Sequence, residues 1–165
     1  MPHPLPRFLA SRLPPPDRYS AAVPTLFFET DAAEGQPPAF GGPTDGLVYF
    51  LSMAFSARYG AQHDFSRLAL LLRGEHKIDL DPLLTFADRN VEVDADAREL
   101  ERVWQDPAPL AATLRAVIER LDAGDPRIDE MVRDAPGLRE RLDDLLRMAE
   151  WAAEREARVR MTFEL

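Results

Sequence analysis

The chain has 165 residues, the size of one domain, with 45% hydrophobic residues, 30% charged residues and a formal net charge of -9. This acidity argues against binding to nucleic acid or to an anionic membrane surface, because both need clustered lysine and arginine. It favours a basic protein partner or a cationic ligand. Lys77 is the only lysine among the 20 basic residues, an arginine bias that is typical of GC-rich bacterial genomes.

Cysteine is absent, which excludes disulfides, thiolate metal ligands and thiol nucleophiles. A chain without cysteine is compatible with a reducing compartment, and we therefore expect a cytoplasmic protein. No run of 18 apolar residues predicts a membrane span. The first residues contain prolines where a secretory signal would have its apolar core, so we do not expect a signal peptide.

Proline sets the first 22 residues apart from the rest of the chain. Ten of the 15 prolines lie at or before Pro43, and six of these fall within residues 1–22. Proline in such numbers prevents a helix, so we expect an extended N-terminal arm over residues 1–22 and one domain over residues 23–165. Three roles for the arm stay open: a docking tail for a partner, an arm packed on its own domain, or a disordered end.

Two segments have the pattern of β-strands. Residues 23–30, VPTLFFET, are rich in residues that favour strands and follow a proline-rich stretch. Residues 159–165, VRMTFEL, alternate between apolar and polar side chains. Because two isolated strands in one domain often pair, the sequence favours, without requiring, a small two-stranded sheet that joins these two segments.

The residues between these strands predict helices with clear start and stop signals. Three of the signals are Asp-Pro pairs, in which the aspartate accepts free N–H groups of the first turn and the proline has no N–H to lose there. Four predicted helices cover residues 45–59, 64–73, 82–90 and 94–104. A fifth begins at residue 107 and ends before Gly124, a short sixth begins at residue 126, and the seventh covers residues 136–158. The expected fold is therefore mainly α, a single-domain bundle of about seven helices.

The loop between the second and third predicted helices contains the candidates for acid–base or metal chemistry, Glu75, His76 and Asp79. A glycine ends the helix before them and an Asp-Pro pair begins the helix after them, so the same residues also fit a solvated connection. His63 cannot share a metal with His76, because the helix between them separates the two by roughly 15–20 Å. GxGxxG, P-loop, GxSxG and HExxH motifs are absent, and we expect neither a cofactor nor a metal.

The helix predicted over residues 45–59 is apolar on almost every face. Its one polar line consists of Tyr49, Ser52, Ser56 and Tyr59, whose spacing puts them on one side of the helix. Because charged residues usually mark a solvent face and are nearly missing here, the hydroxyl groups are candidates for the lining of a ligand pocket. A partner or homodimer surface, a lightly exposed edge, and hydroxyls bonded to the helix backbone are the alternatives.

Trp104 and Trp151 are candidates for a partner surface, since tryptophan is enriched at interface hot spots; packing at the core edge is the alternative. Together these features favour a non-catalytic cytoplasmic protein-binding module with an acidic helical surface, acting as an adaptor, an inhibitor or an assembly subunit. Two alternatives stay open. One is a small-molecule-binding or enzymatic domain that uses the hydroxyl line, and the other is an acidic mimic of nucleic acid.

Overall fold

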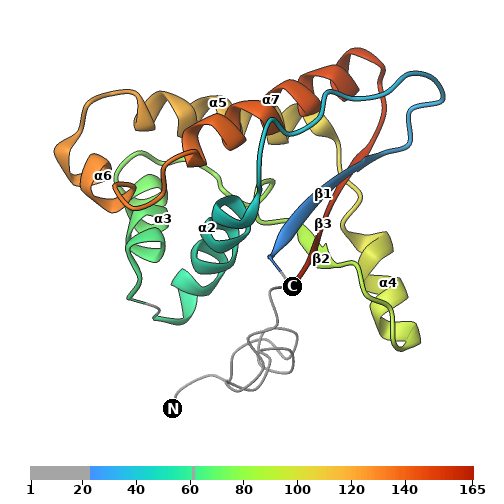
Figure 1. Ribbon diagram of the computed structural model, residues 1–165, viewed down its shortest axis with the longest axis horizontal. Helices are drawn as coiled ribbons and strands as arrows, with labels where there is room; N and C mark the ends of the chain where they lie inside the picture. Colours follow the sequence, from blue (N-terminus) through green and yellow to red (C-terminus); the bar gives the residue numbers. More distant parts are fainter. Residues whose placement is uncertain (1–22, 61) are drawn as a thin grey trace.

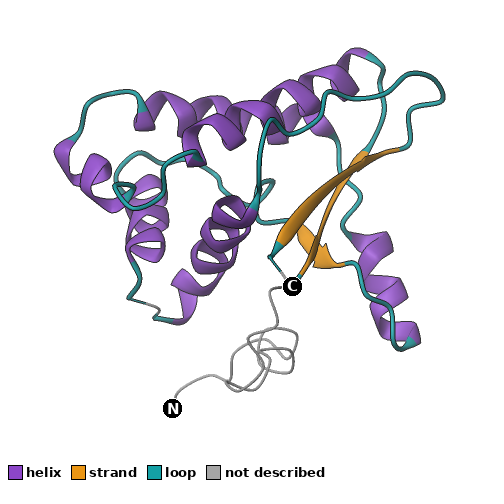
Figure 2. Ribbon diagram, viewed as in Figure 1, coloured by secondary structure: helices purple, strands orange, loops and turns teal. Residues whose placement is uncertain are grey.

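The computed structural model describes residues 23–60 and 62–165, and within these ranges the chain forms six α-helices and a three-stranded mixed sheet (Figures 1 and 2). The strands are β1 (Thr25–Thr30), β2 (Phe86–Asp88) and β3 (Val159–Glu164). The helices are α2 (Asp45–Ser56), α3 (Asp64–Gly74), α4 (Asp94–Arg102), α5 (Pro107–Leu121), α6 (Pro126–Met131) and α7 (Leu138–Glu154), and a 3-10 turn η1 (Ala57–Tyr59) follows α2. The predicted arm over residues 1–22 lies outside the described residues.

The prediction of a mainly α bundle of seven helices is wrong, because the fold is mixed α/β with 51% helix. The helix predicted over residues 82–90 is replaced by a turn at 81–84 and by β2. Leu80, Leu83 and Ala87 are all buried, and β2 pairs with β3. Burial of this segment and its pairing with β3 outweigh the local start signal of the Asp-Pro pair, whose preference is weak beside tertiary contacts.

The sheet has the order β1-β3-β2, with β3 in the centre. β1 runs antiparallel to β3 and places Thr25 opposite Glu164 and Thr30 opposite Val159, which confirms the predicted pairing of the two end segments. β2 runs parallel to β3, with Ala87 opposite Thr162. The central strand is largely buried, as expected for a strand with a neighbour on each side.

The hydrophobic core lies between the long helices and the sheet. α5 and α7 lie side by side, with α2 and α3 beneath them in the view of Figure 1. α2 is central, as its apolar sequence predicts, and its Phe50 is fully buried with its ring edge-on to Phe65 at 5.7 Å. Five leucines of α5 and α7 share this core: Leu110, Leu114, Leu138, Leu142 and Leu145. Each fully buried leucine contributes about 1.5–3 kcal/mol through the hydrophobic effect.

Two buried polar contacts fix where α2 begins. The Thr44 hydroxyl accepts a hydrogen bond from the Leu26 N–H at 2.9 Å, which joins β1 to the start of α2. On α7, the buried Asp144 carboxylate accepts the Gly41 N–H at 2.9 Å. The same carboxylate pairs with Arg141, whose Nε lies 3.0 Å from Oδ2. The loop before α2 is thereby held against α7.

Candidate functional site: the groove between α2 and α7

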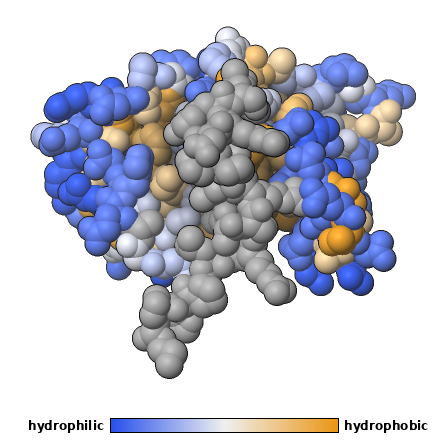
Figure 3. All heavy atoms as spheres, turned by 60° about the horizontal axis from the view of Figure 1, so that its bottom comes forward, coloured by the Kyte–Doolittle hydropathy of each residue, from blue (hydrophilic) through white to orange (hydrophobic). Residues whose placement is uncertain are grey.

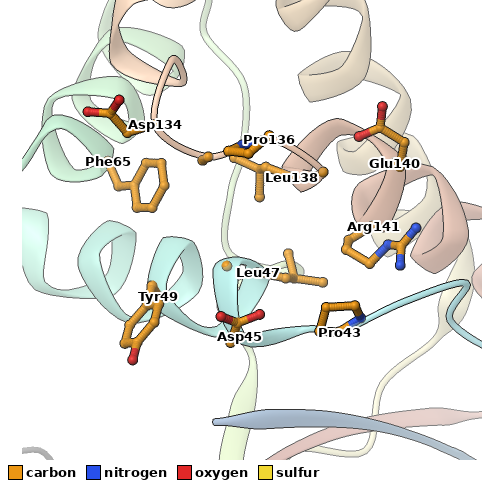
Figure 4. A pocket seen from close by; sticks show the side chains of 13 residues that line it. Pro43, Asp45, Leu47, Tyr49, Phe65, Asp134, Pro136, Leu138, Glu140 and Arg141 are labelled. Atoms are coloured by element: carbon orange, nitrogen blue, oxygen red, sulfur yellow. The ribbon is translucent and has the colours of Figure 1, made fainter. Parts of the chain in front are cut away.

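A hollow of about 510 Å³ lies between the start of α2 and residues 134–141, which lead into α7 (Figure 4). Its floor is formed by Leu47 and Leu138, which are buried, and Figure 4 shows Leu138 pointing from α7 toward α2. Its apolar walls are Pro43, Tyr49 and Pro136. Tyr49, at 46% exposure, is the large hydrophobic residue of this lining that is exposed.

A second hollow of about 200 Å³ continues the first along α2. The two hollows share Tyr49, Phe65, Asp134 and Ala135, and the second adds Met53, His63, Asp64 and Met131. We call the two together the α2–α7 groove. Along α2 its lining extends from Asp45 to Met53.

The local sequence accounts for the wall formed by residues 135–137. Gly137 has a φ of +94°, a left-handed conformation that favours glycine, and α7 begins directly after it. The Leu138 N–H donates to the Ala135 carbonyl at 3.2 Å, and the Arg141 N–H donates to the Gly137 carbonyl at 3.0 Å. This turn directs Leu138 into the core and leaves Pro136 on the wall of the groove.

Three carboxylates, those of Asp45, Asp134 and Glu140, line the larger hollow. Among the residues that the structure describes, none of the three has an ion-pair partner. Arg141 is the one basic residue in the described lining, and the buried Asp144 already offsets its charge. The groove therefore combines apolar walls with negative charge that the described part of the chain does not neutralise.

The four hydroxyl residues of the 45–59 segment are not brought into one pocket with these carboxylates. Tyr49 lies in the groove, and Figure 4 shows its hydroxyl directed away from α7. Ser52 and Ser56 are half-buried and do not line either hollow. Tyr59 lies in η1, is 41% exposed, and its ring is 6.3 Å from that of Phe55. Only Tyr49 of this line takes part in the groove.

Glu75, one of the acid–base candidates, forms an ion pair that joins the end of α3 to α6. Its two carboxylate oxygens accept hydrogen bonds from Arg127 at 2.8 and 2.9 Å. These bonds hold the pKa of Glu75 below its usual range, so the group is ionised and is a weak base near neutral pH. Arg127, which the sequence did not single out, also bonds to Asp125 and lowers the pKa of that carboxyl to about 2.

His76 and Asp79 do not assemble a metal site with Glu75. The Asp79 carboxylate accepts the Asp81 N–H at 3.0 Å, a local turn contact. His76 is half-buried, and its Nε2 has no hydrogen-bond partner among the described residues. No group of three or more histidine and acidic side chains in the described ranges has the arrangement of a metal site.

Both tryptophans pack against arginines of the same chain. The Arg160 guanidinium lies 4.6 Å from the ring centroid of Trp104, and that of Arg158 lies 5.4 Å from it. Arg155 lies 4.0 Å from the ring of Trp151. Such cation–π contacts contribute about 0.5–1 kcal/mol at exposed sites and explain why these half-buried rings lie at the edge of the core. A partner surface at either ring stays a prediction.

Comparison with protein-family models, curated proteins and solved structures finds no match to this chain. None of the described helices is both long and apolar enough to cross a membrane. In Figure 3, the coloured atoms around the grey residues are mainly hydrophilic, with some hydrophobic areas among them.

Proposed function

We propose that this protein is a non-catalytic cytoplasmic protein-binding module, an adaptor, inhibitor or assembly subunit, and that its α2–α7 groove binds a basic segment of a partner. The observation that carries the proposal is the set of carboxylates on Asp45, Asp134 and Glu140, which share one hollow and have no ion-pair partner among the described residues. Like charges in one hollow repel each other, and an incoming guanidinium or ammonium group relieves that repulsion. Arginine also forms short, charge-assisted hydrogen bonds with carboxylates.

The walls of the groove supply the apolar part of the proposed interface. Tyr49 is exposed and rigid, with only two side-chain torsions to fix, and tyrosine is enriched at binding hot spots. Pro43 and Pro136 add apolar surface whose backbone is already restricted. An extended segment in which apolar residues alternate with arginines matches these walls and the carboxylates at the same time. The two adjoining hollows suit such a segment better than a compact ligand.

The role of the carboxylates is tested with two variants of the full chain that remove equal charge. The groove variant carries Asp45→Asn, Asp134→Asn and Glu140→Gln. The control variant carries Glu34→Gln, Asp94→Asn and Glu164→Gln, at exposed positions outside the groove. Each chain is immobilised and exposed to an extract of the native host, and retained proteins are quantified by mass spectrometry.

We expect the wild-type chain and the control variant to retain the same partner in equal amounts. The groove variant should retain at least about tenfold less of it, because the loss of even one hot-spot residue weakens binding by about that factor. Partner recovery should also fall when salt is raised from 0.05 to about 0.5 M, because exposed charges are screened over shorter distances. Equal recovery on the groove and control variants would contradict a role for this groove.

The role of the apolar wall is tested with a matched pair of tyrosines. Tyr49 and Tyr59 have similar exposure, 46% and 41%, but only Tyr49 lines the groove. We expect Tyr49→Ala to weaken partner binding about tenfold or more and Tyr59→Ala to leave it unchanged, measured by titration with the recovered partner. Equal effects of the two changes would show that the contact does not lie in the groove.

A further inference from the structure

The two parts of this chain carry charge of opposite sign. Residues 1–22 contain three arginines and one aspartate, a formal charge of +2, and the rest of the chain therefore carries -11 within the net charge of -9. Attraction between the arm and the acidic body is thus expected from composition, and it is strongest where body carboxylates lack cations. Among the described residues, the α2–α7 groove is such a place, since Asp45, Asp134 and Glu140 have no ion-pair partner.

The arm also has the apolar chemistry that the groove walls require. Its residues 7–13 read RFLASRL, so that Arg7 precedes Phe8 and Leu9, and Arg12 precedes Leu13. Aromatic and aliphatic side chains next to arginines are the combination that matches Tyr49 and the unpaired carboxylates. The prolines on both sides of this stretch reduce the conformational entropy that a bound segment loses.

The arm is long enough to reach the groove of its own molecule. The described chain begins at Val23, and the fifteen Cα–Cα steps from Phe8 to Val23 span up to about 50 Å when extended. A domain of this size has a radius of gyration of about 15 Å. A tethered segment has an effective concentration in the millimolar range, which exceeds that of a second copy at micromolar protein concentration.

We infer that residues 7–13 bind the α2–α7 groove of the same molecule and compete there with the protein partner. This inference rests on the proposed function, because arm and partner use the same carboxylates. Arg7 and Arg12 pair with the groove carboxylates, and Phe8 and Leu9 contact the walls around Tyr49. The partner must then displace the arm, so the arm lowers the apparent affinity of the module for that partner.

The contact is tested in the full chain with a spin label. Because the natural chain has no cysteine, His3→Cys gives a single attachment point for a nitroxide outside residues 7–13. Amide NMR signals are compared before and after reduction of the nitroxide. We expect at least twofold loss of intensity at Tyr49, Ala135 and Glu140, little loss at Asp94 in α4, and no such loss in the groove variant. Broadening of Asp94 equal to that of the groove would overturn the inference.

A mixture of spin-labelled and isotope-labelled molecules separates contact within a molecule from contact between copies. Groove broadening that appears fully in this mixture would assign the arm to a second copy and overturn the inference as stated. Arg7→Gln combined with Arg12→Gln supplies an independent readout, and we expect this variant to retain at least about twice as much partner as the wild-type chain. Reduced retention would show instead that the arm itself binds the partner.

These results also separate the inference from the proposed function. If the groove signals are not broadened but the groove variant still loses the partner, the inference fails and the groove remains the partner site. If the partner is retained equally by the groove and control variants, the proposed function fails whatever the spin label reports.

Discussion

Replacing Asp144 with alanine is expected to lower the free energy of unfolding by about 3–5 kcal/mol, the cost of removing one member of a buried ion pair. The carboxylate is 5% exposed and lies 3.0 Å from the Arg141 Nε, and that arginine side chain is itself only 16% exposed. The change would leave the Arg141 charge in a largely buried position without its counter-ion. It would also remove the acceptor of the Gly41 N–H.

The contributions to this cost differ with burial. Arg147, the third partner of Asp144, has an exposed side chain that stays hydrated without the carboxylate, so losing this contact costs less than about 1 kcal/mol. The unpaired Gly41 N–H costs about 1–3 kcal/mol if no water replaces the carboxylate. Most of the expected loss of stability therefore comes from the unpaired Arg141 charge and the unpaired Gly41 N–H. Arg141 lines the groove, and Gly41 lies in the loop before α2.

The assay is urea denaturation of the full chain, followed by circular dichroism, with Asp143→Ala as the control. Asp143 precedes Asp144 on α7, but it is 38% exposed and pairs only with arginines at the surface, Arg147 at 2.9 Å and Arg139 at 3.7 Å among the described residues. We expect its replacement to cost less than about 1 kcal/mol. A loss for Asp144→Ala no larger than that for Asp143→Ala would refute the reasoning from burial.

Other predictions concern the core, a helix cap and acid stability. Phe50→Ala should cost about 3–5 kcal/mol in urea denaturation, because Phe50 is fully buried, whereas the 52% exposed Leu70 should tolerate alanine within about 0.5 kcal/mol. Asp106→Ala should cost about 0.5–2 kcal/mol by thermal denaturation, because the Asp106 carboxylate accepts the Ala108 N–H at 2.9 Å at the start of α5. The folded pKa of Asp125 is about 2 and its unfolded value 3.8, so its stabilising effect is complete above about pH 5 and is lost as pH falls toward 2. Urea midpoints measured from pH 2 to 5 should fall more steeply in the wild-type chain than in Arg127→Gln, and equal slopes would contradict this assignment.

The sequence predicted the elements whose signals are local. α5 and α6 begin at Pro107 and Pro126, where Asp106 and Asp125 accept the N–H groups of their first turns as expected. The pairing of the two end segments also followed from their composition. β2 was missed because three residues are too few to show an alternating pattern, and its pairing with β3 depends on a strand about 75 residues later.

The groove was harder to foresee, because its walls come from residues 43–49 and 134–141, which only the fold brings together. Tyr49 was singled out, but for its hydroxyl group rather than its ring. One signal was present in the sequence: Asp143 has an arginine four residues later, whereas Asp45, Asp134 and Glu140 have no basic residue three or four positions away. The absence of such helical partners was the sequence signal that these carboxylates could carry charge that their own helix does not neutralise.

Binding at the α2–α7 groove is tested most directly by hydrogen–deuterium exchange of the full chain, alone and in complex with the partner recovered by capture. We predict slower amide exchange in residues 43–53 and 131–141 of the complex, with α4 and β2 unchanged. Slower exchange confined to α4, to β2 or to the outer edge of β1 would contradict the assignment and place the partner elsewhere on the molecule.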